Sequence, residues 1–151
     1  MGVSANGVRA AMRNRRGQAT VEMAIAFPVL IVVAVIAVNV TLFFSECAAF
    51  DRAFRQETRA IAASPAYAQG TAQSAAQIKA AIDERFDASY LATEVNAAAG
   101  DSGCVRFDGT LDYAPMLFGR GMVDEVFGVA LPHLRHSTYL VVDVYKPGVF
   151  F

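Results

Sequence analysis

The feature that most constrains this chain is an uncharged apolar run over residues 24–44. At about 1.5 Å of rise per residue, these 21 residues would form a helix of roughly 32 Å, close to the ~30 Å hydrocarbon core of a bilayer. A buried core helix is the alternative, but such helices are usually shorter and apolar on one face only. The run therefore predicts a single membrane-spanning helix, followed by roughly a hundred residues that can form one small head.

Charged residues before the run indicate its orientation. The first twenty residues contain no acidic side chain. They do contain four arginines: Arg9, Arg13, Arg15 and Arg16. Basic flanks tend to stay in the cytoplasm, so we expect a cytoplasmic N-terminus and a head outside the cytoplasmic (inner) membrane. Without residues 1–17 the chain keeps 9 basic residues (13 minus 4) against 14 acidic ones, and we expect no nucleic-acid partner.

The predicted span belongs to a longer helix. Residues 1–17 are small, polar and basic, and we expect them to be a leader peptide. Residues 18–45 should form the transmembrane half of the helix. The lack of glycine and proline up to residue 63 predicts an extracytoplasmic half over residues 46–63. One face of that half is apolar and should pack against the head; it carries Cys47, Phe50, Phe54 and Ile61.

The remaining residues, 64–151, predict a small α+β head. After a connector, a second amphipathic helix is expected from about residue 72 to residue 92, followed by a loop over residues 96–103. From Cys104 the apolar residues alternate with polar ones. The dipeptide Asp108-Gly109 then predicts a hairpin turn.

Two further segments complete the head. Residues 137–147 are rich in β-branched and aromatic side chains and predict the longest strand. Residues 115–132 are apolar but interrupted by glycine and proline. They predict either a short helix near residues 123–127 or an exposed apolar patch that contacts a partner or the membrane surface.

A short motif precedes the apolar run: Arg15-Arg16-Gly17, a neutral Gln18, and Glu22 as the fifth residue counted from Gln18. It resembles the cleavage site of type IV prepilins, in which a peptidase would cut between Gly17 and Gln18. The continuation "ATVEMAIAFPVLIVV" is similar to the TadE-like family, the pilin-like proteins of tight-adherence (Tad or Flp-type) pilus systems. The resemblance covers roughly residues 15–46 and implies a pilin-like layout, with a long helix followed by a small antiparallel sheet.

The resemblance suggests an ion pair for Glu22. Cleavage after Gly17 would create an amino terminus, with an ordinary pKa near 8, on the first turn of the helix. A carboxylate at the bilayer centre costs roughly 2.5 to 3.5 kcal/mol on insertion scales, so a buried Glu22 needs a partner. The new ammonium of the same or of an adjacent subunit could be that partner and would set the register of assembly. The alternative is a glutamate that rests at headgroup level.

Three other residues of the run are distinctive. Pro28 predicts a mild kink, which membrane helices tolerate. Asn39 and Thr41 are the strongly polar residues of the run. They predict either hydrogen bonds across to a neighbouring helix or a solvated upper end.

The two cysteines, Cys47 and Cys104, would lie in an oxidising compartment. A disulfide between them would close a loop of nearly sixty residues and stabilise the head by about 4 kcal/mol. Two free thiols are an equally weighted alternative.

Enzymatic functions find no support in the residues. His133 and His136 are close together beside Pro132, but no carboxylate or cysteine stands at a metal-binding spacing. The chain contains no phosphate-binding glycine loop and no nucleophile elbow. We therefore expect no catalytic residue, no metal and no cofactor.

The resemblance implies a non-enzymatic minor pilin or pseudopilin that takes part in adhesion. It also implies its partners: a prepilin peptidase, other pilins, the assembly platform of the inner membrane, membrane lipid, and the pilus at the cell surface. Two alternatives stay open. A membrane-anchored binding domain would keep residues 1–17, and a secreted protein would be cleaved by signal peptidase near residues 47–49.

Overall fold

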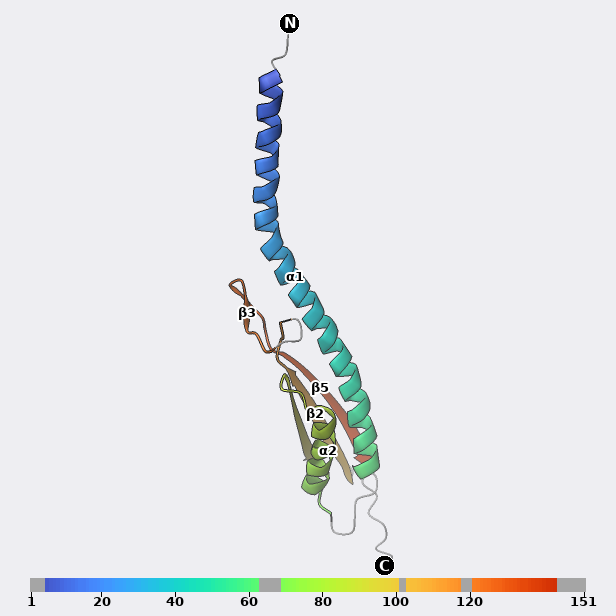
Figure 1. Cartoon of the computed structure of the whole chain (residues 1–151). Coiled ribbons are helices and arrows are strands. Elements are labelled where there is room, and N and C mark those ends of the chain that lie inside the picture. The colour runs from blue at the N-terminus through green and yellow to red at the C-terminus, as the bar shows by residue number, and fades with distance from the viewer. Residues whose placement is uncertain (1–4, 63–68, 101–102, 118–120, 144–151) are drawn as a thin grey trace, which may run out of the picture.

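The longest element is one continuous helix, α1 (Ala5–Ala62), whose N-terminal half projects far beyond the rest of the molecule (Figure 1). The computed structural model describes residues 5–62, 69–100, 103–117 and 121–143, with side chains described from residue 18 onward. The continuous helix predicted over residues 20–63 is confirmed within these limits, and its backbone starts earlier, within the predicted leader.

An α+β head packs against the C-terminal half of α1, as the sequence predicts (Figure 1). It contains helix α2 (Thr71–Arg85) and three long antiparallel strands in the order β1-β2-β5. The strands are β1 (Leu91–Ala99), β2 (Cys104–Tyr113) and β5 (Leu134–Asp143). A separate small hairpin consists of β3 (Glu125–Val126) and β4 (Val129–Ala130).

The core of the head forms where α1 and α2 cover one face of the sheet. The predicted apolar face of α1 is confirmed, since Phe50 and Phe54 are fully buried. Ile78 and Ile82 of α2 are also fully buried and belong to the same cluster. Along the central strand β2 every second residue is buried, which is the alternation expected of a sheet covered on one side.

The predicted turn at Asp108-Gly109 is wrong, because β2 runs straight through it. Asp108 and Gly109 pair with Tyr139 and Thr138 of β5 as ordinary strand residues. The glycine is explained by close packing instead, since a Cβ at position 109 would lie 2.7 Å from the Phe54 ring. Only a residue without a side chain lets the aromatic face of α1 approach the strand so closely.

Three other boundaries differ from the predictions. Helix α2 ends at Arg85, and residues expected to be helix and loop form β1, because pairing with β2 outweighs the helix preference of their alanines. The short helix near residues 123–127 is replaced by the β3–β4 hairpin. The last strand begins three residues early, at Leu134, and residues 144–147 of that prediction lie outside the described part.

Candidate functional site

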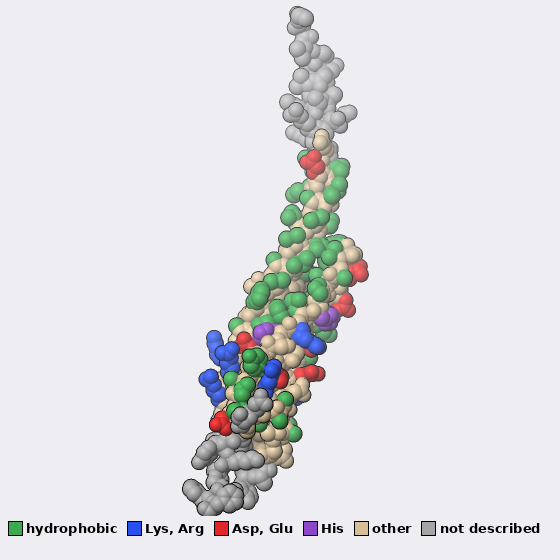
Figure 2. Space-filling view, turned by 180° about the vertical axis from the view of Figure 1, so that it is seen from behind, with side chains coloured by type: hydrophobic (Ala, Val, Ile, Leu, Met, Phe, Trp, Pro, Cys, Tyr) green, Lys and Arg blue, Asp and Glu red, His purple; other side chains and the backbone are tan. Residues whose placement is uncertain are grey.

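The first part of the apolar run of α1 is exposed on all sides. Seven large apolar side chains between residues 21 and 33 are 57 to 68% exposed: Val21, Met23, Ile25, Phe27, Val29, Leu30 and Val33. Consecutive helical residues differ by about 100° in direction, so the segment is exposed on every side up to Leu30, and the head covers one side only from Ile31 onward. By length and composition, the described chain contains one helix able to cross a membrane. Figure 2 shows apolar side chains along this segment, beyond the charged surface of the head.

The predicted cleavage residues Gly17 and Gln18 and the predicted pairing residue Glu22, one turn later, all lie on this helix. Glu22 is exposed, and its Oε1 accepts a hydrogen bond of 3.3 Å from Nε2 of Gln18, one turn earlier. Its neighbours along the same helix face line a shallow apolar hollow: Ile25, Ala26, Val29 and Leu30. Glu22 is therefore a carboxylate at the end of an otherwise apolar helix face. Cleavage between Gly17 and Gln18 stays a prediction.

Pro28 lies inside α1, where it cannot donate the usual hydrogen bond to the carbonyl of Ala24. Figure 1 shows that α1 changes direction gently between its straight N-terminal part and the part that carries the head. A mild bend of this kind is what an internal proline produces.

Asn39 joins α1 to the head and does not face solvent or another helix. Its side chain is 5% exposed and makes four hydrogen bonds. Nδ2 donates to the carbonyls of Val35 (2.9 Å) and Met116 (2.8 Å). Oδ1 accepts from the Met116 amide (2.7 Å) and the Tyr113 hydroxyl (3.0 Å). Both predictions for Asn39 are therefore wrong. Thr41 is exposed and donates to the Ala37 carbonyl of its own helix, which agrees with the predicted solvated end and not with a bond to a neighbouring helix.

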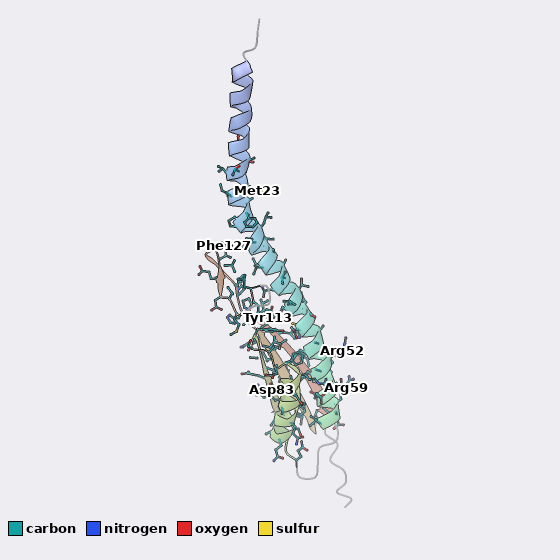
Figure 3. The ribbon with its side chains drawn as sticks, in the orientation of Figure 1. Met23, Arg52, Arg59, Asp83, Tyr113 and Phe127 are labelled. Atoms are coloured by element: carbon teal, nitrogen blue, oxygen red, sulfur yellow. The ribbon has the colours of Figure 1, made fainter. Side chains whose placement is uncertain are left out.

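Tyr113 completes this junction between the end of β2 and α1 (Figure 3). It is fully buried, and its ring contacts Phe43 and Tyr90 edge to face at 5.8 and 5.7 Å between centroids. Burial, and then the charges of Tyr90 and Glu46, raise the pKa of the Tyr113 hydroxyl. A raised pKa keeps the hydroxyl protonated as the donor that Asn39 needs.

The head reaches even further down the apolar run. Val35 is 1% exposed and forms a small core with Val126 of β3 and Leu131. Ile31 and Val32 pack around this core. The predicted span of residues 24–44 is therefore covered by protein on one side from about residue 31, and only its first part is exposed on every side.

The two cysteines are free. Gly109 lies against Phe50 and Phe54, and Tyr113 lies against Phe43, so Cys47 is level with about Leu111 of β2. Cys104 is roughly seven residues further along the strand, or about 23 Å away. A disulfide requires Cα atoms within about 7 Å, so the predicted Cys47–Cys104 bridge is wrong for this fold.

We expect the two thiols to react at different rates. Cys47 is buried, and burial and the nearby Asp51 carboxylate raise its pKa, which leaves less reactive thiolate at a given pH. Cys104 is half-buried at the start of β2. N-ethylmaleimide should therefore modify Cys104 first in the native full chain and Cys47 mainly after unfolding, as peptide mass analysis would show. If the mass of the unreduced chain were lower by two hydrogens, as disulfide formation requires, this arrangement would be contradicted.

The histidines have carboxylate neighbours that the sequence did not reveal. His136 belongs to β5 and places Nε2 at 2.9 Å from Oδ1 of Asp51 on α1. His133 places Nε2 at 3.3 Å from Oδ1 of the exposed Asp124. Each is a pair, and among the described residues no group of three or more His, Cys, Asp or Glu side chains could hold a metal ion.

Comparisons with protein-family models, curated proteins and solved structures give no significant match to this chain. The resemblance to TadE-like proteins therefore rests on the N-terminal residues themselves.

The sequence did not reveal two features of the contact between α1 and the head: the partners of Asn39 and the β3–β4 hairpin. The hairpin had a weak local signal, because Phe127-Gly128 stands between Val126 and Val129 at the position where Asn-Gly is the usual turn dipeptide.

Proposed function

We propose that this chain is a TadE-like minor pilin or pseudopilin, a membrane-inserted subunit that assembles through α1. One observation carries the proposal: Glu22 is the single carboxylate on a fully exposed apolar helix segment, five residues after Gly17. A surface of this kind is unstable in water and needs lipid or neighbouring helices around it. The other half of α1 bears the exposed Arg52, Arg55 and Arg59 and belongs in water together with the head.

Glu22 supplies the specificity of such an assembly. Its carboxylate ends the apolar face that continues through Ile25, Ala26, Val29 and Leu30. A neighbouring helix that packs along this face could place its amino terminus, freed by cleavage before Gln18, against the carboxylate. The ion pair would be formed in a low dielectric, where an unpaired carboxylate is costly.

Retention of α1 is favoured over secretion by the contacts of the head. Signal peptidase cleavage near residues 47–49 would separate Asn39 and Phe43 from Tyr113 and Met116. It would leave the Met116 backbone groups and the Tyr113 hydroxyl without their partner, at a cost of about 1 to 3 kcal/mol for each buried group. A simple membrane-anchored binding domain shares these contacts and differs only in keeping residues 1–17.

The N-terminus of the mature protein tests the proposal. In protein purified from its native membrane, we expect the chain to begin at Gln18. In a strain without prepilin peptidase, it should keep residues 1–17. An intact leader in the presence of the peptidase would favour the anchored binding domain, and a start near residue 48 would mean secretion.

Replacing Glu22 by glutamine should affect assembly of the subunit but not its insertion into the membrane. The amide has nearly the same shape but no charge, so membrane insertion should persist while incorporation into a pilus or pilin complex should be lost. Cross-linking of membranes followed by blotting would measure both. Glu22→Asp keeps the charge and is the matched control, with partial assembly expected. Normal assembly of Glu22→Gln would favour a carboxylate at headgroup level.

A further inference from the structure

The turn of the β3–β4 hairpin contains an unusual residue. Val126 pairs with Val129, which leaves Phe127 and Gly128 as a two-residue turn. Their φ angles are 50° and 79°. Positive φ at both positions is typical of type I′ turns, in which asparagine followed by glycine is preferred. Positive φ strains the backbone of a bulky residue, and Phe127 is the one non-glycine residue in this conformation within the described ranges.

Among the described residues, little covers the Phe127 side chain in return. Its ring is 66% exposed, and Val129 beside it is 42% exposed. An aromatic residue with a strained backbone and an exposed side chain suggests a contact outside the chain.

The position of the hairpin identifies that contact. Val126 and Leu131 pack on Val35 within the apolar run of α1. Figure 3 shows Phe127 at the end of the head nearest Met23, with the hairpin pointing along α1 toward its fully exposed apolar half. From Gln18, the first residue after the predicted cleavage, to Val35 the helix rises roughly 26 Å, close to the thickness of the hydrocarbon core. The hairpin therefore lies where the side of α1 that faces the head would leave the bilayer, earlier than residue 44, the end expected from the sequence.

We propose that the hairpin tip, residues 126–129, inserts into the outer interface of the bilayer that α1 crosses. The inference rests on the membrane insertion of the proposed function and does not depend on pilus assembly. The tip stays at the interface and does not enter the hydrocarbon, because the hairpin has unpaired backbone edges and carries the exposed Asp124 and Glu125. Phe127 and Val129 contact the acyl-chain boundary, while the carboxylates remain among the headgroups. The hairpin and the lower helix thus hold the head in one orientation on the membrane.

A single tryptophan can test this, since the chain contains none. We would reconstitute three full-length variants separately in phosphatidylcholine vesicles whose acyl chains are brominated near the headgroup or near the chain end. Phe127→Trp reports on the tip and Phe27→Trp on the span. Tyr139→Trp is an exposed control on β5, opposite Asp108 and far along α1 from Val35.

We expect bromine near the headgroup to quench most of the Phe127→Trp emission and chain-end bromine to quench less. Phe27→Trp should be quenched strongly, and Tyr139→Trp should keep its emission. Quenching of Phe27→Trp without quenching of Phe127→Trp would overturn the tip contact and leave the membrane anchor standing. Unquenched Phe27→Trp would overturn the anchor itself. A blue-shifted Phe127→Trp that lipid bromine does not quench would mean that another protein copy covers the tip.

Phe127→Asn gives a second, independent readout. Asparagine suits positive φ, so the hairpin should be at least as stable as before. Without the ring, the head should lose its fixed orientation, and Val129→Trp in this background should lose most of the quenching that it shows alone. Unchanged quenching of Val129→Trp after Phe127→Asn would contradict a role of Phe127 in holding the tip in the interface.

Discussion

Replacing Gly109 by alanine should lower the free energy of unfolding of the head by about 2 to 3 kcal/mol. The added Cβ would lie 2.7 Å from both Cδ2 and Cε2 of Phe54 and 3.2 Å from Cζ of Phe50. Neither ring can move away easily, because both are fully buried. The two rings also stack on each other at 6.0 Å, and Phe50 is held by Phe86 and His136. Urea unfolding of the full chain in detergent, followed by near-ultraviolet circular dichroism, would measure the loss.

A double-mutant cycle would show whether the cost is steric. Phe54→Ala alone should cost about 3 to 5 kcal/mol through the cavity that it leaves. In that background Gly109→Ala should cost much less, because the new methyl group enters the vacated space. Gly70→Ala, where a Cβ meets nothing within 4 Å, is the matched control and should cost under about 1 kcal/mol. An equal cost of Gly109→Ala with and without the Phe54 ring would contradict the explanation.

Gly109 also shows where sequence-based prediction of the head reaches its limit. An Asp-Gly pair between alternating apolar residues is a hairpin signal on local grounds. What decides against a turn is the approach of Phe54, a residue of another element. The same holds for β1, where an alanine-rich segment becomes a strand because β2 lies beside it. The long helix α1 needed no such partner, since its length and composition are local properties.

The candidate site likewise contains residues that the sequence alone reveals and residues whose partners only the fold reveals. Gly17, Gln18 and Glu22 form a contiguous motif, so their spacing could be recognised in the sequence alone. The partners of Asn39 in the head lie 74 and 77 residues away, and no local pattern connects them with Asn39. Phe127 is an intermediate case: Phe-Gly marks the turn, but only the position of the hairpin beside Val35 relates it to the membrane.

Asn39→Leu should lower the free energy of unfolding of the head by about 3 kcal/mol, because it leaves several buried polar groups without a partner. These are the amide and carbonyl of Met116 and the hydroxyl of Tyr113. Leucine has the same branching and the same number of side-chain heavy atoms and is somewhat larger, so it leaves no cavity and the loss would come mainly from hydrogen bonding. The Met116 amide should also lose its protection from hydrogen exchange, which mass spectrometry of the full chain in detergent can follow.

The same substitution should leave membrane insertion intact or improve it, because leucine is favoured over asparagine in a spanning helix. Thr41→Val removes an exposed hydroxyl that bonds only to its own helix, and it should change stability by less than about 0.5 kcal/mol. Tyr113→Phe removes one of the four bonds and should cost about 1 kcal/mol. If Asn39 instead bonded a neighbouring helix, Asn39→Leu would weaken self-association and leave the Met116 amide protected. Loss of that protection in the monomer, with insertion unchanged, would assign Asn39 to the junction between α1 and the head.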